Sequence, residues 1–218
     1  MEKIYFDEIN STQIYAKEQA KLGELNKIYI AKTQTSGIGR NGHLWTSNKG
    51  GLYFSFITEC YSEIYTITVG VAVYKALEEL YGIKTKIKWP NDILLNNKKV
   101  AGIICEKINN VIVVGIGINT NFEEEKLGEI KEIATTLKSS VNIKINNDIL
   151  LDKIIENIEK LNYNKETLSI FRDNMAFLNE KRFIGQINKE AIIKGIDDSG
   201  YLIACDEIQE YKISGGII

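Results

Sequence analysis

The stretch from Lys86 to Glu106, KIKWPNDILLNNKKVAGIICE, is expected to decide the fold. Pro90, the only proline of the chain, has no N–H and a fixed φ, so it predicts a turn that ends strand pairing. Asn96-Asn97 is typical of a hairpin turn. These breaks divide the segment into strands expected at Lys84–Trp89, Asp92–Leu95 and Lys98–Cys105.

On either side of this segment, strands and helices alternate. Further strands are expected at Lys3–Phe6, Lys27–Gln34, Leu52–Thr58 and Val111–Asn119, the last apolar enough to be buried on both faces. Helices are expected from the cap signal Asn10-Ser11-Thr12 to about Leu22, and at Tyr65–Leu80, Asn147–Leu161 and Thr167–Leu178. The pattern indicates an α/β chain.

After Asn179 the pattern becomes strand-rich. RFIGQI, AIIKGI, YLIAC and YKISG are short apolar runs separated by turn residues. A β unit of about 40 residues is at the lower limit for independent folding, so we expect it to dock on the larger part. The predicted domains are residues 1–178 and 179–218.

The composition excludes several classes of protein. Of 218 residues 44% are hydrophobic, enough for a core, and the net charge is −2. A general nucleic-acid or membrane-surface binder needs a basic excess, which is absent. No apolar run approaches the ~18 residues of a membrane-spanning helix. The N-terminus, MEKIYFDEINST, is acidic where a signal peptide is basic, so we expect a cytoplasmic protein.

Histidine and cysteine are too sparse for several kinds of chemistry. His43 is the only histidine, and Cys60, Cys105 and Cys205 are far apart. A zinc site needs several such ligands at short spacing, so no metal site is predicted in the protein. The cysteines are interpreted as reduced, mostly buried thiols.

The loop Thr35–Gly51 contains the pattern G-x-G-x-x-G at Gly37–Gly42. This pattern is typical of dinucleotide sites where its last glycine opens a helix, but here a turn-like segment leads into a strand. A plain surface loop is a second interpretation. Against it, Arg40 offers a planar fork for phosphate and Trp45 a stacking face among glycines that let N–H groups approach an anion. These residues favour a loop that folds over a nucleotide.

Lys88 is expected at the rigid end of a strand, pointing into the same cavity as this loop. A lysine there is a positioned charge for a carboxylate or a phosphate. The alternative is a solvated turn with an incidental lysine.

KWPNDILLNNKKVAGIICE, QTSGIGRNGHLW and VVGIGINTN together resemble the biotin–protein ligase family. DEINSTQ is similar to its Ser-Thr-Asn segment, Ala134–Leu137 to its A-T-S-L region, and GIDDSGYL with SGG to its SH3-like tail. The resemblance implies an α/β (α+β type) catalytic domain on a mixed sheet followed by a small SH3-like β-barrel. It implies the activity of a biotin–[acetyl-CoA-carboxylase] ligase. Such an enzyme uses ATP, with Mg²⁺, to convert biotin to biotinyl-5′-AMP, and then transfers biotin to a lysine of a biotin carboxyl carrier protein.

The resemblance also implies roles for individual residues. Lys88 and Arg40 would be catalytic. Biotin would be bound by Ser11, Thr12, Gln13, Gln34, Gly37, Ile38, Gly39, Arg40, Lys88, Gly102 and Gly115. ATP would be bound by Arg40, Trp45, Lys88 and Asn119.

The chain departs from the family pattern in two places. Ile38, Asn41 and His43 stand where the family loop has basic residues, and the tail reads SGGII without the family's glutamate and arginine. The chain begins directly at the catalytic domain, so we expect no DNA-binding domain, no DNA or membrane partner, and a monomer or homodimer. Two alternatives stay open: a lipoate or octanoate ligase or transferase of the same fold, and a biotin or adenylate sensor without ligase activity.

Overall fold

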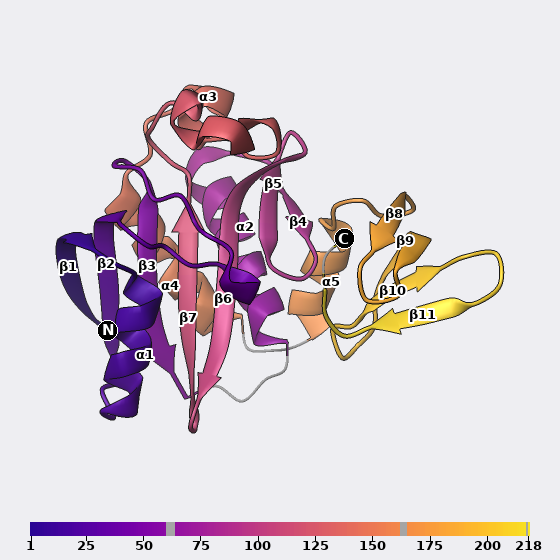
Figure 1. The fold of residues 1–218 in the computed structure, drawn as a ribbon, viewed down its shortest axis with the longest axis horizontal. Helices are drawn as coiled ribbons and strands as arrows, with labels where there is room; N and C mark the ends of the chain where they lie inside the picture. The colour runs from indigo at the N-terminus through magenta and orange to yellow at the C-terminus, as the bar shows by residue number, and fades with distance from the viewer. Residues whose placement is uncertain (60–63, 162–164, 217) are drawn as a thin grey trace.

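The segment around Pro90 forms one edge of a seven-stranded mixed sheet (Figure 1). The computed structural model describes residues 1–59, 64–161, 165–216 and 218. The strand order is β1-β2-β3-β7-β6-β5-β4, parallel between β1 and β2 and antiparallel between the other neighbours. These strands are β1 (Glu2–Ile9), β2 (Lys27–Gln34), β3 (Leu52–Thr58), β4 (Lys86–Lys88), β5 (Asp92–Leu95), β6 (Lys98–Ile108) and β7 (Val111–Ile118).

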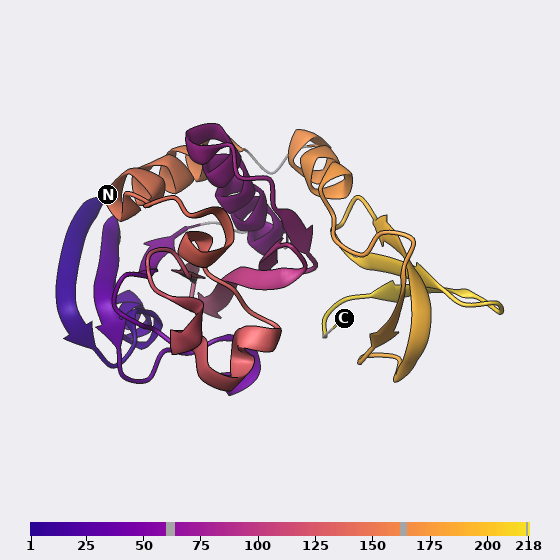
Figure 2. The same ribbon diagram turned by 90° about the horizontal axis from the view of Figure 1, so that it is seen from above.

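Helices cover both faces of this sheet (Figure 2). Ala16 of α1 packs on Tyr29 and Val113 on one face. Ile28 and Val114, the neighbouring residues on the same strands, point to the opposite face, where α2 and α4 pack together. The helices are α1 (Thr12–Lys21), α2 (Tyr65–Tyr81), α3 (Leu137–Val141), α4 (Asn147–Lys160) and α5 (Lys165–Asp173), with 3₁₀ segments η1 (Arg40–Gly42) and η2 (Glu124–Glu132).

The C-terminal residues form a second, four-stranded antiparallel sheet, in agreement with the expected SH3-like unit. Its apolar residues, including Ile193 and Leu202, continue the core of the larger part. The indole N–H of the buried Trp89 donates to the carbonyl oxygen of Gly200 at 2.9 Å. The turn next to Lys88 is therefore fastened to the second sheet. Its strands, in the order β11-β10-β9-β8, are β8 (Lys181–Ile184), β9 (Lys189–Ile196), β10 (Leu202–Cys205) and β11 (Glu210–Ile213).

Most predicted elements are confirmed, and one helix was placed wrongly. The pattern at Thr167–Leu178 predicted a helix to Leu178, but α5 ends at Asp173. The chain then runs beside β4, where Ile87 donates to Asn174 and accepts from Ala176, both at 2.9 Å. In a longer helix, the backbone groups of residues 174–176 would have bonded within the helix. Here they form hydrogen bonds with the free edge of β4 instead.

The sequence interpretation missed η2 and α3, which follow β7. Cys105 and Cys205 are half-buried rather than buried, and Cys60 lies outside the described residues. No helix in the described part of the chain is long and apolar enough to cross a membrane.

Candidate active site

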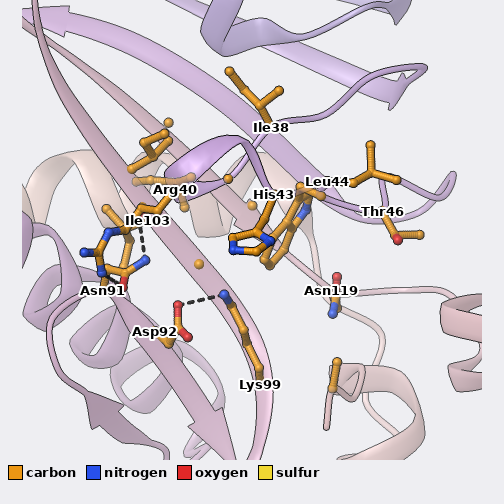
Figure 3. Close-up of a pocket in the computed structure, with 18 of the residues that line it drawn as sticks. Ile38, Arg40, His43, Leu44, Thr46, Asn91, Asp92, Lys99, Ile103 and Asn119 are labelled. Carbon is orange, nitrogen blue, oxygen red and sulfur yellow. Dashed lines mark hydrogen bonds and ion pairs between the residues drawn. The ribbon is translucent and has the colours of Figure 1, made fainter. Parts of the chain in front are cut away.

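A cavity of about 610 Å³ opens where the glycine loop, the Pro90 turn and the central strands meet. Figure 3 shows Arg40 beside Asn91, and Lys99 beside Asp92, beneath the loop that carries His43 and Leu44. The start of α1, the η2 segment and the tail of the second sheet complete the wall. Segments far apart in sequence therefore share one site.

The floor of the cavity is made of glycines on paired strands. Gly102 of β6 lies opposite Gly117 of β7, and the indole of Trp45 lies against both. A Cβ on Gly117 would come within 2.5 Å of the Trp45 indole nitrogen, and a Cβ on Gly115 within 2.5 Å of Gln13 Oε1. Real Cβ atoms do not approach this closely, so these glycines make room for the two side chains.

One end of the cavity is a buried network of neutral polar groups. Gln34 Oε1 accepts from the Thr12 backbone N–H at 2.8 Å and from its hydroxyl at 3.2 Å. The same hydroxyl lies 2.9 Å from Ser55 Oγ, while Ser11 caps α1 by accepting from the Ile14 N–H at 3.4 Å. Satisfied partners of this kind hold polar side chains in fixed positions inside a core.

Gln13 continues this network and keeps one group free. Its amide nitrogen donates to Glu106 at 3.0 Å and to the Val113 carbonyl at 3.2 Å. Its buried Oε1 has no hydrogen-bond partner among the described residues, and Gln13 lines the cavity. An unpaired buried acceptor of this kind is suited to receive an N–H from a ligand.

The glycine loop is a small hairpin over the cavity. Ile38 pairs with Leu44, Gly39 donates to the His43 carbonyl at 2.7 Å, and Trp45 donates to the Gly37 carbonyl at 2.8 Å. The tip passes through a left-handed conformation, with φ of 55° at Asn41 and 74° at the glycine that follows. The loop thus has the short β pairing expected of a hairpin and not the helix start of a dinucleotide fold.

Arg40 fastens this loop to the turn beyond Lys88. Its guanidinium donates to Asn91 Oδ1 at 2.8 Å, and the Asn91 amide nitrogen donates to the Ile103 carbonyl at 2.9 Å. The prediction that Lys88 and the loop face one cavity is confirmed, because Lys88 and Arg40 both line it.

Lys88 is a half-buried cation at the end of β4. Burial lowers the pKa of its ammonium group; Asp92 opposes the shift, and Lys99 and Arg182 add to it. Asp92 itself is bound to Lys99 Nζ at 2.7 Å. Lys88 lacks a salt bridge within the described part of the chain, so its charge is available to an anion.

Asn119 lies where β7 leaves the sheet. Its side-chain nitrogen donates to the Thr135 carbonyl at 3.0 Å, and its backbone N–H to the Val100 carbonyl at 2.9 Å. Its buried Oδ1 has no partner within the described ranges, which leaves an acceptor at the cavity wall.

Comparison with known proteins decides the family. A model of the biotin/lipoate A/B protein ligase family matches residues 5–123, more than half of the chain. The chain belongs to this family. It is 37% identical to the bifunctional ligase/repressor BirA of Bacillus subtilis in an alignment of 171 positions that covers 72% of this chain and 52% of that protein. It therefore spans about half the length of that relative.

Two further similarities extend over a larger share of the matched protein. The biotin–[acetyl-CoA-carboxylase] ligase of Paracoccus denitrificans is 26% identical, over 80% of this chain and 82% of that protein. The solved biotin protein ligase of Aquifex aeolicus in complex with biotin and ATP aligns with a TM-score of 0.87 and 31% identity, covering 99% of this chain and 96% of that chain. The family fold is therefore shared almost from end to end.

In this ligase-family chain, the residues singled out from the sequence converge. Except for Gly37, which lies in the loop against Ser47 and does not reach the cavity wall, the proposed site residues all line the cavity. Those that line it are Ser11, Thr12, Gln13, Gln34, Ile38, Gly39, Arg40, Trp45, Lys88, Gly102, Gly115 and Asn119.

Sequence reasoning missed other wall residues. Asn91 and Asp92 belong to the recognised turn, yet their bonds to Arg40 and Lys99 were not foreseen. Leu127 and Ile130 of η2 and Ile133 directly after it are spaced three residues apart, and all lie on the wall. That spacing is the period of a 3₁₀ helix and would have predicted the segment.

Proposed function

We propose that the chain is an ATP-dependent biotin–protein ligase. The observation that carries the proposal is that Lys88, a cation without a salt bridge among the described residues, lines the same cavity as the neutral polar network and the glycine loop with its Arg40. A carboxylate and the α-phosphate of ATP must meet at such a point. In the first step, a biotin carboxylate oxygen attacks the α-phosphorus, the bond to the bridging oxygen breaks, and pyrophosphate leaves.

The residues suit this chemistry because the nucleophile needs no base. A carboxylate is already an anion at neutral pH, so the first step requires no general base. A chain with His43 as its only histidine can therefore carry it out. The barrier lies in bringing two anions together and in stabilising charge that grows on the phosphate. Lys88, Arg40 and the N–H groups of the glycine loop supply the positive charge.

The neutral network is the proposed site for the ureido ring of biotin. Gln13 Oε1 lacks a partner among the residues described and accepts a ring N–H, while the hydroxyl groups of Ser11 and Thr12 and the Gln34 side chain serve the rest of the ring. Gly115 leaves the ring room against β7, and Gly102 and the loop residues Ile38 and Gly39 enclose the remaining surface, with Gly37 packed against Ser47 to support the loop. A neutral polar ring needs short partners in an apolar pocket.

The nucleotide is proposed to lie along the loop. Trp45 packs on the adenine, Asn119 Oδ1 accepts from the nucleoside, and Arg40 and Lys88 contact the phosphates. The described residues contain no cluster of three or more His, Cys, Asp or Glu side chains able to hold a metal ion. Mg²⁺ is therefore expected to arrive with ATP, held by the phosphate oxygens.

In the second step, a lysine amine of an acceptor protein attacks the carbonyl carbon of the adenylate, and AMP leaves. The acceptor proposed here is a biotin carboxyl carrier protein of acetyl-CoA carboxylase, which the name of the Paracoccus relative supports. For this function we divide the chain into residues 1–178, the ligase domain, and 179–218, the C-terminal unit. The start of β8 at Lys181 supports that boundary.

The test is ATP–pyrophosphate exchange with biotin, lipoate or octanoate as the acid. We expect exchange with biotin only, and labelling of an added carrier domain on lysine. Exchange with lipoate or octanoate but not biotin would assign the chain to the other branch of the family. Tight biotin binding without exchange would make it a sensor.

A further inference from the structure

A cation of the second sheet lies beside the candidate active site. The guanidinium carbon of Arg182, on β8, is 4.0 Å from the ring centroid of Phe177, and Phe177 lines the cavity. Phe177 has φ of 63°, a left-handed conformation that a bulky residue rarely adopts. Such strain tends to persist where a side chain must be held toward a ligand.

Arg182 has hydrogen-bonding capacity to spare. Its Nε is buried and has no acceptor among the residues that the structure describes. One terminal nitrogen binds Glu180 at 2.5 Å, but the Glu180 side chain is 53% exposed. Exposed ion pairs hold their partners weakly, so this contact can be exchanged for a stronger anion. A guanidinium offers two parallel donors to one phosphate.

The charges around Lys88 make this corner of the cavity attractive to an anion. Arg182 and Lys99 both lower the pKa of Lys88, so their positive charges act on the same place. Asp92, the one carboxylate that opposes them there, is bound to Lys99. A bound polyanion would relieve the repulsion among these cations, and the glycine loop adds Arg40 to the cavity wall.

We propose that Arg182 binds the β- and γ-phosphates of ATP, the pyrophosphate that leaves in the first step. The proposal rests on the proposed function, since Lys88 and Arg40 are there assigned to the point where the carboxylate meets the α-phosphate. Arg182 belongs to the second sheet and stacks on Phe177 of the cavity wall, and its Nε, which lacks an acceptor among the described residues, suits the end of the phosphate chain. The second sheet would then belong to the nucleotide site.

The experiment compares Arg182→Gln with Lys181→Gln. Lys181 is the adjacent residue on β8, exposed and paired with Glu190 at 3.3 Å, and its side chain leaves the opposite face of the strand. We expect Arg182→Gln to raise the KM for ATP and for pyrophosphate in the exchange reaction about tenfold or more, the loss expected for a charge-assisted hydrogen bond. The KM for biotin should change less than twofold, and Lys181→Gln should change none of the three.

A second readout separates phosphate binding from a structural role. Biotin transfer from preformed biotinyl-5′-AMP involves no β- or γ-phosphate, so Arg182→Gln should carry it out at the wild-type rate. Calorimetric titration with magnesium pyrophosphate should show weakened binding in the same variant. Glu180→Gln frees the guanidinium and should tighten pyrophosphate binding about twofold.

Three results would overturn the assignment of Arg182. They are unchanged pyrophosphate and ATP constants in Arg182→Gln, an equal loss in Lys181→Gln, and an equal loss in transfer from the preformed adenylate. Wild-type protein without any biotin-dependent exchange would contradict the proposed function instead. The titration with magnesium pyrophosphate would still test Arg182 in that case. If Arg182→Gln does not fold, Glu180→Gln decides, and weaker or unchanged pyrophosphate binding there counts against the proposal.

Discussion

The two ends of the cavity are built differently. At the end proposed for biotin, Ser11, Thr12 and Gln13 are buried, and Thr12 and Gln13 are joined by short hydrogen bonds to side chains on neighbouring strands. At the end proposed for the nucleotide, the wall includes the glycine loop and the η2 region, which carry exposed apolar side chains. Leu44 is 75% exposed and Ile133 is 71% exposed.

This difference suggests that one end of the cavity recognises the acid and the other end retains the nucleotide. A neutral ring is selected by buried partners whose positions are fixed before it binds, because an unpaired polar group there is costly. A charged nucleotide is held by cations and by apolar residues that can close over it. Under the proposed function, the rigid sheet would set which acid is chosen, and the loops would set how long its adenylate stays bound.

The largest effect is expected at the boundary of the two ends, in Lys88→Ala. The change removes a cation aimed at a developing anion, worth about 2.7–4 kcal/mol by analogy with single oxyanion-hole donors. Biotin-dependent exchange should fall by about 10²–10³-fold. Lys86→Ala, an exposed lysine on the same strand, should leave exchange unchanged. Near-normal exchange in Lys88→Ala, with an unchanged circular dichroism spectrum, would remove Lys88 from the mechanism.

The next prediction tests the two ends separately through neighbouring glycines of β7. Gly115→Ala would place a Cβ 2.5 Å from Gln13 Oε1, and Gly117→Ala would place one 2.5 Å from the Trp45 indole. Overpacking of about 1–3 kcal/mol corresponds to roughly 5–150-fold in affinity. We expect Gly115→Ala to weaken biotin binding and Gly117→Ala to weaken ATP binding, each measured by calorimetry.

A matched control for this pair is Gly70→Ala, since a Cβ there meets Ile87 only at an ordinary 3.6 Å. It should bind both substrates like the wild type. If both β7 variants lose biotin and ATP affinity equally, the cavity responds as one unit and the separation of its ends is wrong.

Much of the fold and site followed from local sequence patterns. The strands Lys27–Gln34, Leu52–Thr58 and Asp92–Leu95 were predicted with their observed bounds, because periodicity and turn residues act over short distances. The end of α5 was not, because the free edge of β4, far away in sequence, takes the hydrogen bonds of residues 174–176. Family motifs predicted which residues gather at the cavity. Contacts that depend on tertiary structure, such as Arg40 with Asn91, lay beyond such patterns.

The third prediction concerns pH. Burial lowers the pKa of Lys88 below its ordinary value, so it loses its proton at a lower pH than an exposed lysine. The KM for ATP should therefore rise as pH increases through the lowered pKa, approaching about tenfold per pH unit above it.

The same burial affects the stability of the fold. The charged ammonium of Lys88 destabilises the folded state at pH values below its lowered pKa. This destabilisation is relieved as pH rises from the lowered pKa to the pKa of the unfolded chain. Lys88→Met should raise the Tm at pH 7. It should also abolish the increase in stability that the wild type shows between the two pKa values. An unchanged Tm and an alkaline KM profile that matches an ordinary lysine would contradict the argument.

The smallest effect is expected at Ile38, where the resembled family has arginine. The adenylate of the proposed reaction is a hydrolysable anhydride, and it would have to stay bound until the acceptor lysine arrives. An arginine side chain would add a charge-assisted bond of about 1.5–3 kcal/mol, roughly 10–150-fold in retention. The backbone of Ile38 already pairs with Leu44, which orders part of the loop, so we expect Ile38→Arg to slow release by about tenfold or less.

The control is Ile38→Gln, which places a polar but uncharged side chain at the same position. It should release the adenylate at the wild-type rate. The measurement is to load labelled adenylate, chase with unlabelled biotin and ATP, and follow the label that stays bound. Equal release from all three proteins would show that the backbone pairing, and not the side chain at this position, controls retention.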